Sequence, residues 1–169
     1  MPERDPQEPR IYDSPGFRLV ADYDDDYVGW AEHQAWLLKH RRFDDLDLDH
    51  LIEEVEDLAN RHRDRLHSHL QTLLVHLLKL AYTQGSSHPE ANWRHTTLRV
   101  RLRIRVLIED HPGLQHEPAA YLPKAYPRAM AEAQIDFDTY GDPHAPFPAE
   151  CPWTLENVLD DDFFPEGSK

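Results

Sequence analysis

The sequence predicts an all-α fold of four to five helices that ends in a short C-terminal helix and a docked tail. Three observations support this class. Apolar side chains recur at helical spacing in several separate stretches of the chain. The longest stretch contains neither proline nor glycine between Asp47 and Gly85. A lone strand in such a chain would have no neighbouring strand to complete its backbone hydrogen bonds.

The first elements are an arm and a capped helix. Residues 1–21 mix proline, arginine and acidic side chains without a period, so we expect an extended N-terminal arm. A run of acids at 22–26 then precedes apolar residues at helical spacing. Because an aspartate caps a helix and favours its positive end, a helix is predicted over 25–41. The arm leads into a single predicted domain over 22–166.

The second predicted helix is long. Asp47 can cap it, and one apolar stripe runs from Leu48 to Ala81. We expect this stripe to face the core along its whole length. Asn60, the weakest helix former there, is the position at which a bend would be expected.

The third stretch has an ambiguous pattern. Residues 97–106 alternate apolar and basic side chains, which by period alone indicates a half-buried strand. A helix over 89–110 buries the same apolar residues and needs no partner strand. We therefore predict a helix.

The last third is rich in proline. A helix over 117–137 is predicted to be kinked or divided, because Pro123 and Pro127 each remove a backbone hydrogen bond. Residues 138–152 form a predicted loop, and 153–160 a short helix. The aromatic pair Phe163 and Phe164 is expected to dock on the bundle.

Five separated motifs resemble those of one bacterial family. They are residues 27–38, 43–56, 76–82, 92–94 and 150–165. On these motifs the chain resembles, over about 22–166, the family called domain of unknown function 29. The resemblance implies an all-α, up-and-down helical bundle and brings no assigned activity. The chain departs from the family at Leu80, where tryptophan is usual, and at the two prolines of the fourth helix.

Length and composition limit the classes of function. The chain has 169 residues, the size of one ordinary domain, and its single Cys151 cannot form an internal disulfide. No stretch approaches the roughly 18 apolar residues of a membrane span, and residues 1–10 lack the apolar core of a signal peptide. We therefore expect a cytoplasmic protein without a membrane partner.

Charge is unevenly distributed along the chain. The net charge is −14, yet residues 61–108 carry 9 basic and 2 acidic side chains. The acidic neighbours of this segment can neutralise it, and its arginines at 99, 101, 103 and 105 do not share one helix face. Nucleic acid is therefore not the expected partner.

The histidines are the candidate metal ligands. His62, His69 and His76 recur every seven residues, so on one helix they stand about 10.5 Å apart and no two can bind one ion. A site assembled from several helices would join one of them to His95 or His33 and to a carboxylate. No cofactor is expected, although this arrangement leaves open a single divalent metal.

One set of polar residues lies within the family-like motifs. Its members are Glu53, Glu54, His76, Lys79, Trp93 and Arg94. Glu54 alone borders the apolar stripe, whereas Glu53 is expected to face solvent or a basic helix. Lys79 is expected to pair with an acid or to extend into water, and Trp93 to anchor a loop in the core. No residue is assigned a catalytic role.

These patterns favour a non-catalytic helical protein that binds an unknown protein partner or a second copy of itself. Long amphipathic helices, segregated charge and the lack of a complete catalytic set support this hypothesis. The alternatives are a metal-dependent enzyme with histidines from several helices, and a nucleic-acid-associated factor that uses residues 61–108.

Overall fold

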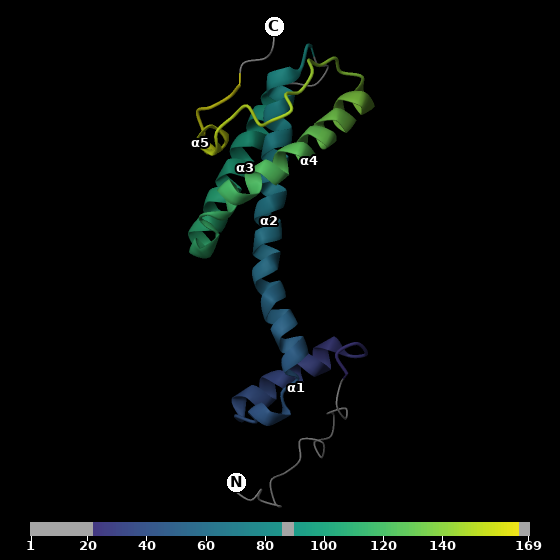
Figure 1. The fold of residues 1–169 in the computed structure, drawn as a ribbon, viewed down its shortest axis with the longest axis vertical. Coiled ribbons are helices and arrows are strands. Elements are labelled where there is room, and N and C mark those ends of the chain that lie inside the picture. Colours follow the sequence, from purple (N-terminus) through teal and green to yellow (C-terminus); the bar gives the residue numbers. More distant parts are fainter. Residues whose placement is uncertain (1–21, 86–89, 166–169) are drawn as a thin grey trace, which may run out of the picture. The chain divides into compact units, whose positions relative to one another are not determined.

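The computed structural model describes residues 22–85 and 90–165, and all its regular elements in these ranges are helical (Figure 1). This confirms the all-α class. The predicted arm at 1–21 lies outside the described residues, as do residues 86–89 and 166–169. The α-helices are α1 (Tyr27–Lys39), α2 (Leu48–Tyr82), α3 (Glu90–Asp110), α4 (Glu117–Tyr140) and α5 (Leu155–Leu159). Two 3-10 turns, η2 (Phe43–Asp45) and η3 (Pro112–Leu114), connect them.

The chain divides into two compact units, Met1–Asp57 and Leu58–Lys169. Of the first unit the structure describes residues 22–57, which form α1, η2 and the first turns of α2. The second unit contains the rest of α2 and the later helices. The predicted single domain over 22–166 stays a prediction, because α2 belongs to both units.

In the first unit, α1 begins where the acidic run predicted it. The carboxylate of Asp26 accepts a hydrogen bond from the backbone N–H of Gly29 at 3.0 Å and so caps the helix. Three side chains of α1 face inward at helical spacing: Trp30, Gln34 and Leu37 are buried. They are the buried side chains of the described part of this unit.

In the second unit, α2, α3, α4 and α5 share one apolar core. Leu66, Leu70, Leu74 and Leu78 of α2 are fully buried, as the inward stripe predicts for this half of the helix. The other helices contribute Val100, Ile104, Leu107, Tyr121, Ala125, Ala129, Ala133 and Val158.

The first turns of α2 differ from the prediction. Leu48, Ile52, Val55 and Leu58 are 57%, 56%, 64% and 56% exposed. The prediction that the whole stripe faces the core is therefore wrong over residues 48–59. The reason is that helical periodicity reveals an apolar face but does not reveal whether another element covers it.

α3 confirms the helical interpretation of the alternating segment. It is one helix from Glu90 to Asp110, and α2 is likewise unbroken through Asn60. Of the two alternatives predicted for the fourth helix, kinked or divided, division is wrong, because α4 continues through Pro123 and Pro127 as far as Tyr140. Both prolines lie on the exposed side, while α4 buries other side chains in the core, and this packing sustains the helix.

The C-terminal segment docks on the second unit. Thr154 caps α5 through the N–H of Asn157 at 3.2 Å. After α5 the chain runs over Arg101, whose guanidinium donates to the carbonyl oxygens of Val158 at 2.9 Å and Phe163 at 2.8 Å. The predicted docking of the tail thus depends on a buried arginine as well as on its aromatic rings.

None of the described helices has both the length and the apolar composition needed to cross a membrane.

Candidate functional site

The first unit exposes more large apolar side chains than it buries. Val28 of α1 is 66% exposed and Phe43 of η2 is 58% exposed. On α2, Leu48, Ile52 and Val55 lie at the spacing i, i+4 and i+7, which places them on one face. These three residues are apolar. We call them the acidic stripe after the acidic side chains that lie beside them. An exposed apolar patch of this kind on a folded protein marks a contact surface.

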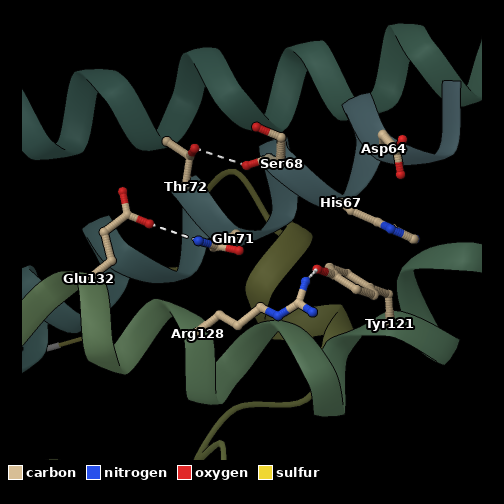
Figure 2. A pocket seen from close by; sticks show the side chains of 8 residues that line it. All are labelled: Asp64, His67, Ser68, Gln71, Thr72, Tyr121, Arg128 and Glu132. Atoms are coloured by element: carbon tan, nitrogen blue, oxygen red, sulfur yellow. Dashed lines mark hydrogen bonds between the residues drawn. The ribbon is translucent and has the colours of Figure 1, made fainter. Parts of the chain in front are cut away.

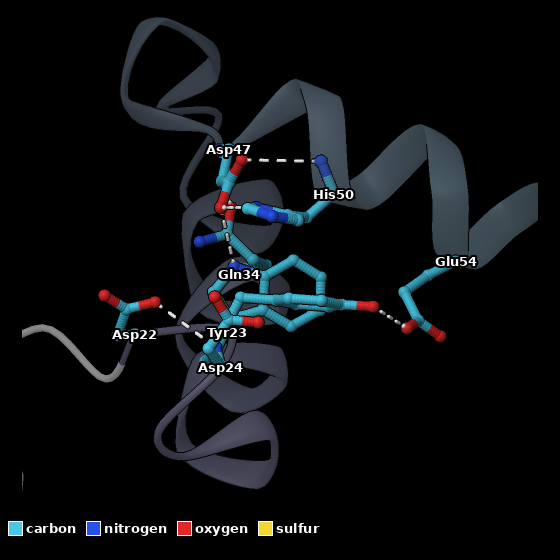
Figure 3. Close-up of polar contacts among 8 residues, drawn as sticks. Asp22, Tyr23, Asp24, Gln34, Asp47, His50 and Glu54 are labelled. Atoms are coloured by element: carbon cyan, nitrogen blue, oxygen red, sulfur yellow. Dashed lines mark hydrogen bonds and ion pairs between the residues drawn. The ribbon is translucent and has the colours of Figure 1, made fainter.

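A polar network around Asp47 fixes α1 to the start of α2 (Figure 3). The Asp47 carboxylate accepts the indole N–H of Trp30 at 3.0 Å and lies 2.7 Å from Nδ1 of His50. The side-chain oxygen of Gln34 accepts the backbone N–H of Asp47 at 2.9 Å. The contact with His50 lowers the pKa of Asp47, and the same contact raises the pKa of His50. The Asp47–His50 pair thus lies at the start of α2, and the bonds from Trp30 and to Gln34 hold α1 against it.

Glu54 forms the second part of this network. Its two carboxylate oxygens accept the hydroxyl groups of Tyr23 and Tyr27, each at 2.7 Å. The bond to Glu54 raises the pKa of Tyr23 to about 12. The Tyr23 ring also stacks on His50, with ring centroids 4.1 Å apart (Figure 3). Glu54 thus serves as an acceptor for two neutral phenols, and it links the chain before α1 to α2.

The charge of the first unit is strongly acidic. Its described residues carry 13 acidic and 3 basic side chains. Asp49, Glu56 and Asp57 are exposed on α2 beside or between the residues of the acidic stripe. A partner that covers the stripe therefore meets a negative rim, and basic side chains would complement it.

The second unit contains a polar groove between α2 and α4 with a volume of about 440 Å³ (Figure 2). Nε2 of His67 lies within hydrogen-bond distance of the Glu117 carboxylate at 2.7 Å, and the His67 ring stacks on Tyr121 with centroids 3.6 Å apart. Arg128 donates to the Tyr121 hydroxyl at 2.8 Å. The groove is lined by Asp64, His67, Ser68, Gln71, Thr72, Tyr121, Arg128 and Glu132.

The polar groups of this groove bond mainly to one another. The Gln71 amide donates to Glu132 at 2.9 Å, and the Thr72 hydroxyl donates to the backbone oxygen of Ser68 at 2.9 Å. Figure 2 shows that the Gln71–Glu132 pair joins α2 to α4, whereas Thr72 and Ser68 both belong to α2. Charged side chains of both signs line the groove. Among the described residues, no contact pairs the Ser68 or the Thr72 hydroxyl with a base. The groove therefore offers a weaker argument for a specific ligand than the apolar surface does.

The residues of the predicted polar set fall into both units. Lys79 forms an ion pair with Asp136 at 2.7 Å, and its ammonium lies 5.3 Å from the centroid of the buried Trp93 ring. Trp93 thus packs in the core as predicted, while the acid partner of Lys79 comes from α4. Arg94 lies over the Phe164 ring at 4.6 Å. In the first unit, Glu53 is exposed as predicted, and Glu54 bonds to the two tyrosines.

The histidines do not converge. His62 meets His111, with ring centroids 3.9 Å apart, and His95 is exposed. Nε2 of His69 and Nδ1 of His76 are buried and have no hydrogen-bond partner. Burial lowers the pKa of His76 to about 4. Across the described ranges no group of three ligand-type side chains is arranged to hold a metal ion. The expectation about cofactors stays a prediction.

Comparison with known proteins assigns the family. The model of the domain of unknown function DUF29 matches residues 23–164. The chain belongs to this family. A crystal structure of an α-helical protein of unknown function from Rhodospirillum rubrum superposes with a TM-score of 0.56 at 23% identity. The match covers 86% of this chain and 93% of that one, and it supports the fold. The search of curated proteins gave no match.

The residues that match DUF29 include both candidate sites. Several residues that organise the structure are not among the site residues predicted from the sequence. Asp47 was expected only to cap a helix, yet it also organises the first unit. Arg101 was grouped with its neighbouring arginines. Its spacing from Thr97 and Ile104, which are buried on the same helix, could have identified it as a core position. His67, Glu117 and Asp136 carry no pattern that predicts their pairing, because it depends on how the helices pack.

Proposed function

We propose that this DUF29 protein is a non-catalytic interaction protein whose first unit binds a helical segment of a protein partner. The observation that carries the proposal is the exposure of the acidic stripe, Leu48, Ile52 and Val55, at 56–64%. An amphipathic helix laid against such a stripe is a common mode of peptide recognition.

The first argument is energetic. Burial of apolar surface contributes roughly 25 cal/mol for each Å² removed from water. The described part of the first unit buries three side chains and leaves the whole acidic stripe in water. Residues 55–61 of α2 are all exposed, and a helix without tertiary contacts is marginal in water. A partner that covers these turns therefore stabilises both the helix and the unit.

The second argument is that the surface is held in shape before a partner arrives. Asp47 and Glu54 tie α1 and the residues before it to α2 through four hydrogen bonds that involve side chains. A rigid surface loses little conformational entropy when it binds, which favours affinity. The polar network is thus consistent with a supporting role beneath a binding surface.

The experiment places a photo-crosslinking amino acid at position 52 of the full chain in its native cell. We expect a crosslinked protein product from position 52 and none from position 135. Ile135 is the matched control, because it is an isoleucine on α4 with an exposure of 64%. Mass spectrometry of the product identifies the partner and the segment that touches α2.

A second variant separates binding from folding. Val55→Asp introduces a charge into the acidic stripe at a side chain that is 64% exposed, so helix content in circular dichroism stays unchanged. We expect the crosslink at position 52 to disappear in this variant and to persist in Ile135→Asp. Equal crosslinking from positions 52 and 135, or a product that survives Val55→Asp, would contradict the proposal.

A further inference from the structure

We propose that the partner segment is α3 of a second copy of this chain, so that two copies associate through reciprocal contacts between α3 and α2. This inference rests on the proposed function and names its partner. It starts from a second exposed apolar stripe, which lies on α3.

α3 has two apolar faces. Val100, Ile104 and Leu107 pack in the core of the second unit. On the exposed side, Leu98, Leu102 and Val106 follow one another at intervals of four residues and are 41%, 53% and 44% exposed. We call these three apolar residues the basic stripe after the arginines that lie beside them. They form a single ridge along the helix, as the spacing requires.

Arginines adjoin this second stripe. Arg99 and Arg103 are exposed on α3, whereas Arg101 is buried and holds the C-terminal segment. Arg105 is half exposed and pairs with Asp161 at 2.6 Å. The rim of the basic stripe is therefore positive where the rim of the acidic stripe is negative. Each stripe consists of three aliphatic side chains on one helix, so the two match in extent and in apolar character. The charged residues that adjoin the two stripes are opposite in sign.

The charge pattern selects this pairing over the symmetric ones. Two first units facing each other would bring together surfaces that each carry 13 acidic and 3 basic side chains in their described residues. Two copies of α3 would likewise bring arginines together. Contact between unlike stripes removes both repulsions and gains attraction at the rim.

A second copy can supply both halves of the contact. α2 carries the acidic stripe and α3 carries the basic stripe, so every copy of the chain offers one of each. A two-fold dimer would therefore contain this contact twice, with the two copies exchanging roles. The second contact then forms at high effective concentration, which strengthens the first.

The test is light scattering coupled to size-exclusion chromatography on the full chain over a range of concentrations. We expect a dimer for the unchanged chain and for Ile135→Asp. Ile52→Asp and Leu102→Asp each disrupt one stripe, and each should raise the dimer Kd by roughly tenfold or more. Unchanged circular dichroism shows that both variants remain folded.

Mixing the two variants gives the decisive result. The α2 of a Leu102→Asp copy and the α3 of an Ile52→Asp copy are both intact, so the mixture should form a heterodimer more tightly than either variant forms a homodimer. A chain with Ile52→Cys, Leu102→Cys and Cys151→Ser should form a disulfide between chains on mild oxidation. Dissociation caused by Ile52→Asp alone, with Leu102→Asp still dimeric, would overturn the pairing, as would a disulfide confined to one chain.

The failures of the two proposals are distinguishable. If the unchanged chain is monomeric at every concentration while position 52 still crosslinks to another protein, the second-copy inference is wrong and the proposed function stands. If the chain is monomeric and position 52 crosslinks to nothing, both are wrong.

Discussion

Arg101 illustrates how one buried charged residue organises a segment far along the chain. Its side chain is 1% exposed, and it reaches backbone oxygens on both sides of residue 160. A guanidinium presents several donors in a fixed plane, so it can satisfy several carbonyl oxygens at once. The Phe164 ring lies over it at 5.2 Å. The arginine thereby converts an acidic tail into part of the folded unit.

Replacing this arginine tests that role. Arg101→Lys keeps the charge but cannot reach the same set of oxygens, so we expect a loss of about 1–3 kcal/mol in the free energy of unfolding. The change should also hasten proteolytic cleavage after residue 153. Arg99→Lys, at an exposed position of the same helix, is the control and should change neither measurement. Equal protease resistance in both variants would contradict the anchoring role.

His76 makes stability depend on pH in a defined direction. Burial, together with the smaller effect of nearby Lys79, lowers the pKa of His76 from 6.5 to about 4, while Asp136 and Glu132 oppose the shift. Between these pH values the unfolded chain binds a proton that the folded chain does not bind. The contribution of His76 to stability is therefore fully present above pH 6.5 and is lost as the pH falls towards 4.

The corresponding variant is His76→Gln. We expect its free energy of unfolding, measured by urea denaturation, to fall less steeply between pH 6.5 and 4 than that of the unchanged chain. His95→Gln removes an exposed histidine and should leave the slope unchanged. Identical slopes in all three proteins would refute the assignment to His76.

At the level of single elements, local signals predicted helices well and tertiary coverage poorly. The helix predicted over 25–41 is found at Tyr27–Lys39, and that over 89–110 at Glu90–Asp110. Caps and breakers are local, so the sequence contains them. Whether another element covers an apolar face, or whether packing sustains a helix through proline, depends on residues far away. The predicted burial of the start of α2 is therefore wrong, and so is a division of α4 at its prolines.

The two halves of α2 should respond differently to truncation of a leucine or isoleucine. Leu74 is fully buried, so Leu74→Ala should lower the free energy of unfolding by about 2–5 kcal/mol. Ile52 is 56% exposed, so Ile52→Ala in dilute protein should change it by no more than about 0.5 kcal/mol. Chemical denaturation measures both. Comparable losses would mean that the first turns of α2 are already covered within one chain.

The prolines of α4 give a prediction of the opposite sign. Pro127 is exposed, so alanine at this position leaves no cavity and allows a backbone hydrogen bond that proline prevents. Pro127→Ala should raise the free energy of unfolding by about 1–3 kcal/mol in the same denaturation experiment. A loss of stability would show that the proline ring itself contributes to packing.

At the scale of the whole molecule, charge and exposed apolar surface support the same account. The net charge of −14 conceals an acidic first unit and a basic α3, and each carries an uncovered aliphatic stripe. The charge segregation follows from the sequence, and binding of a partner or a second copy stays a prediction. The sequence does not locate the surface, because the same stripe is predicted to lie in a core.

The most direct test of this account is amide hydrogen exchange along α2 in the full chain at increasing protein concentration. The account predicts that residues 55–61, which lie beyond the polar network and are exposed, exchange rapidly in dilute solution and gain protection as the dimer forms, while residues 66–78 stay protected throughout. In Leu102→Asp the gain should shift to much higher concentration. Protection of residues 55–61 that is independent of concentration would contradict the claim that a second copy covers this surface.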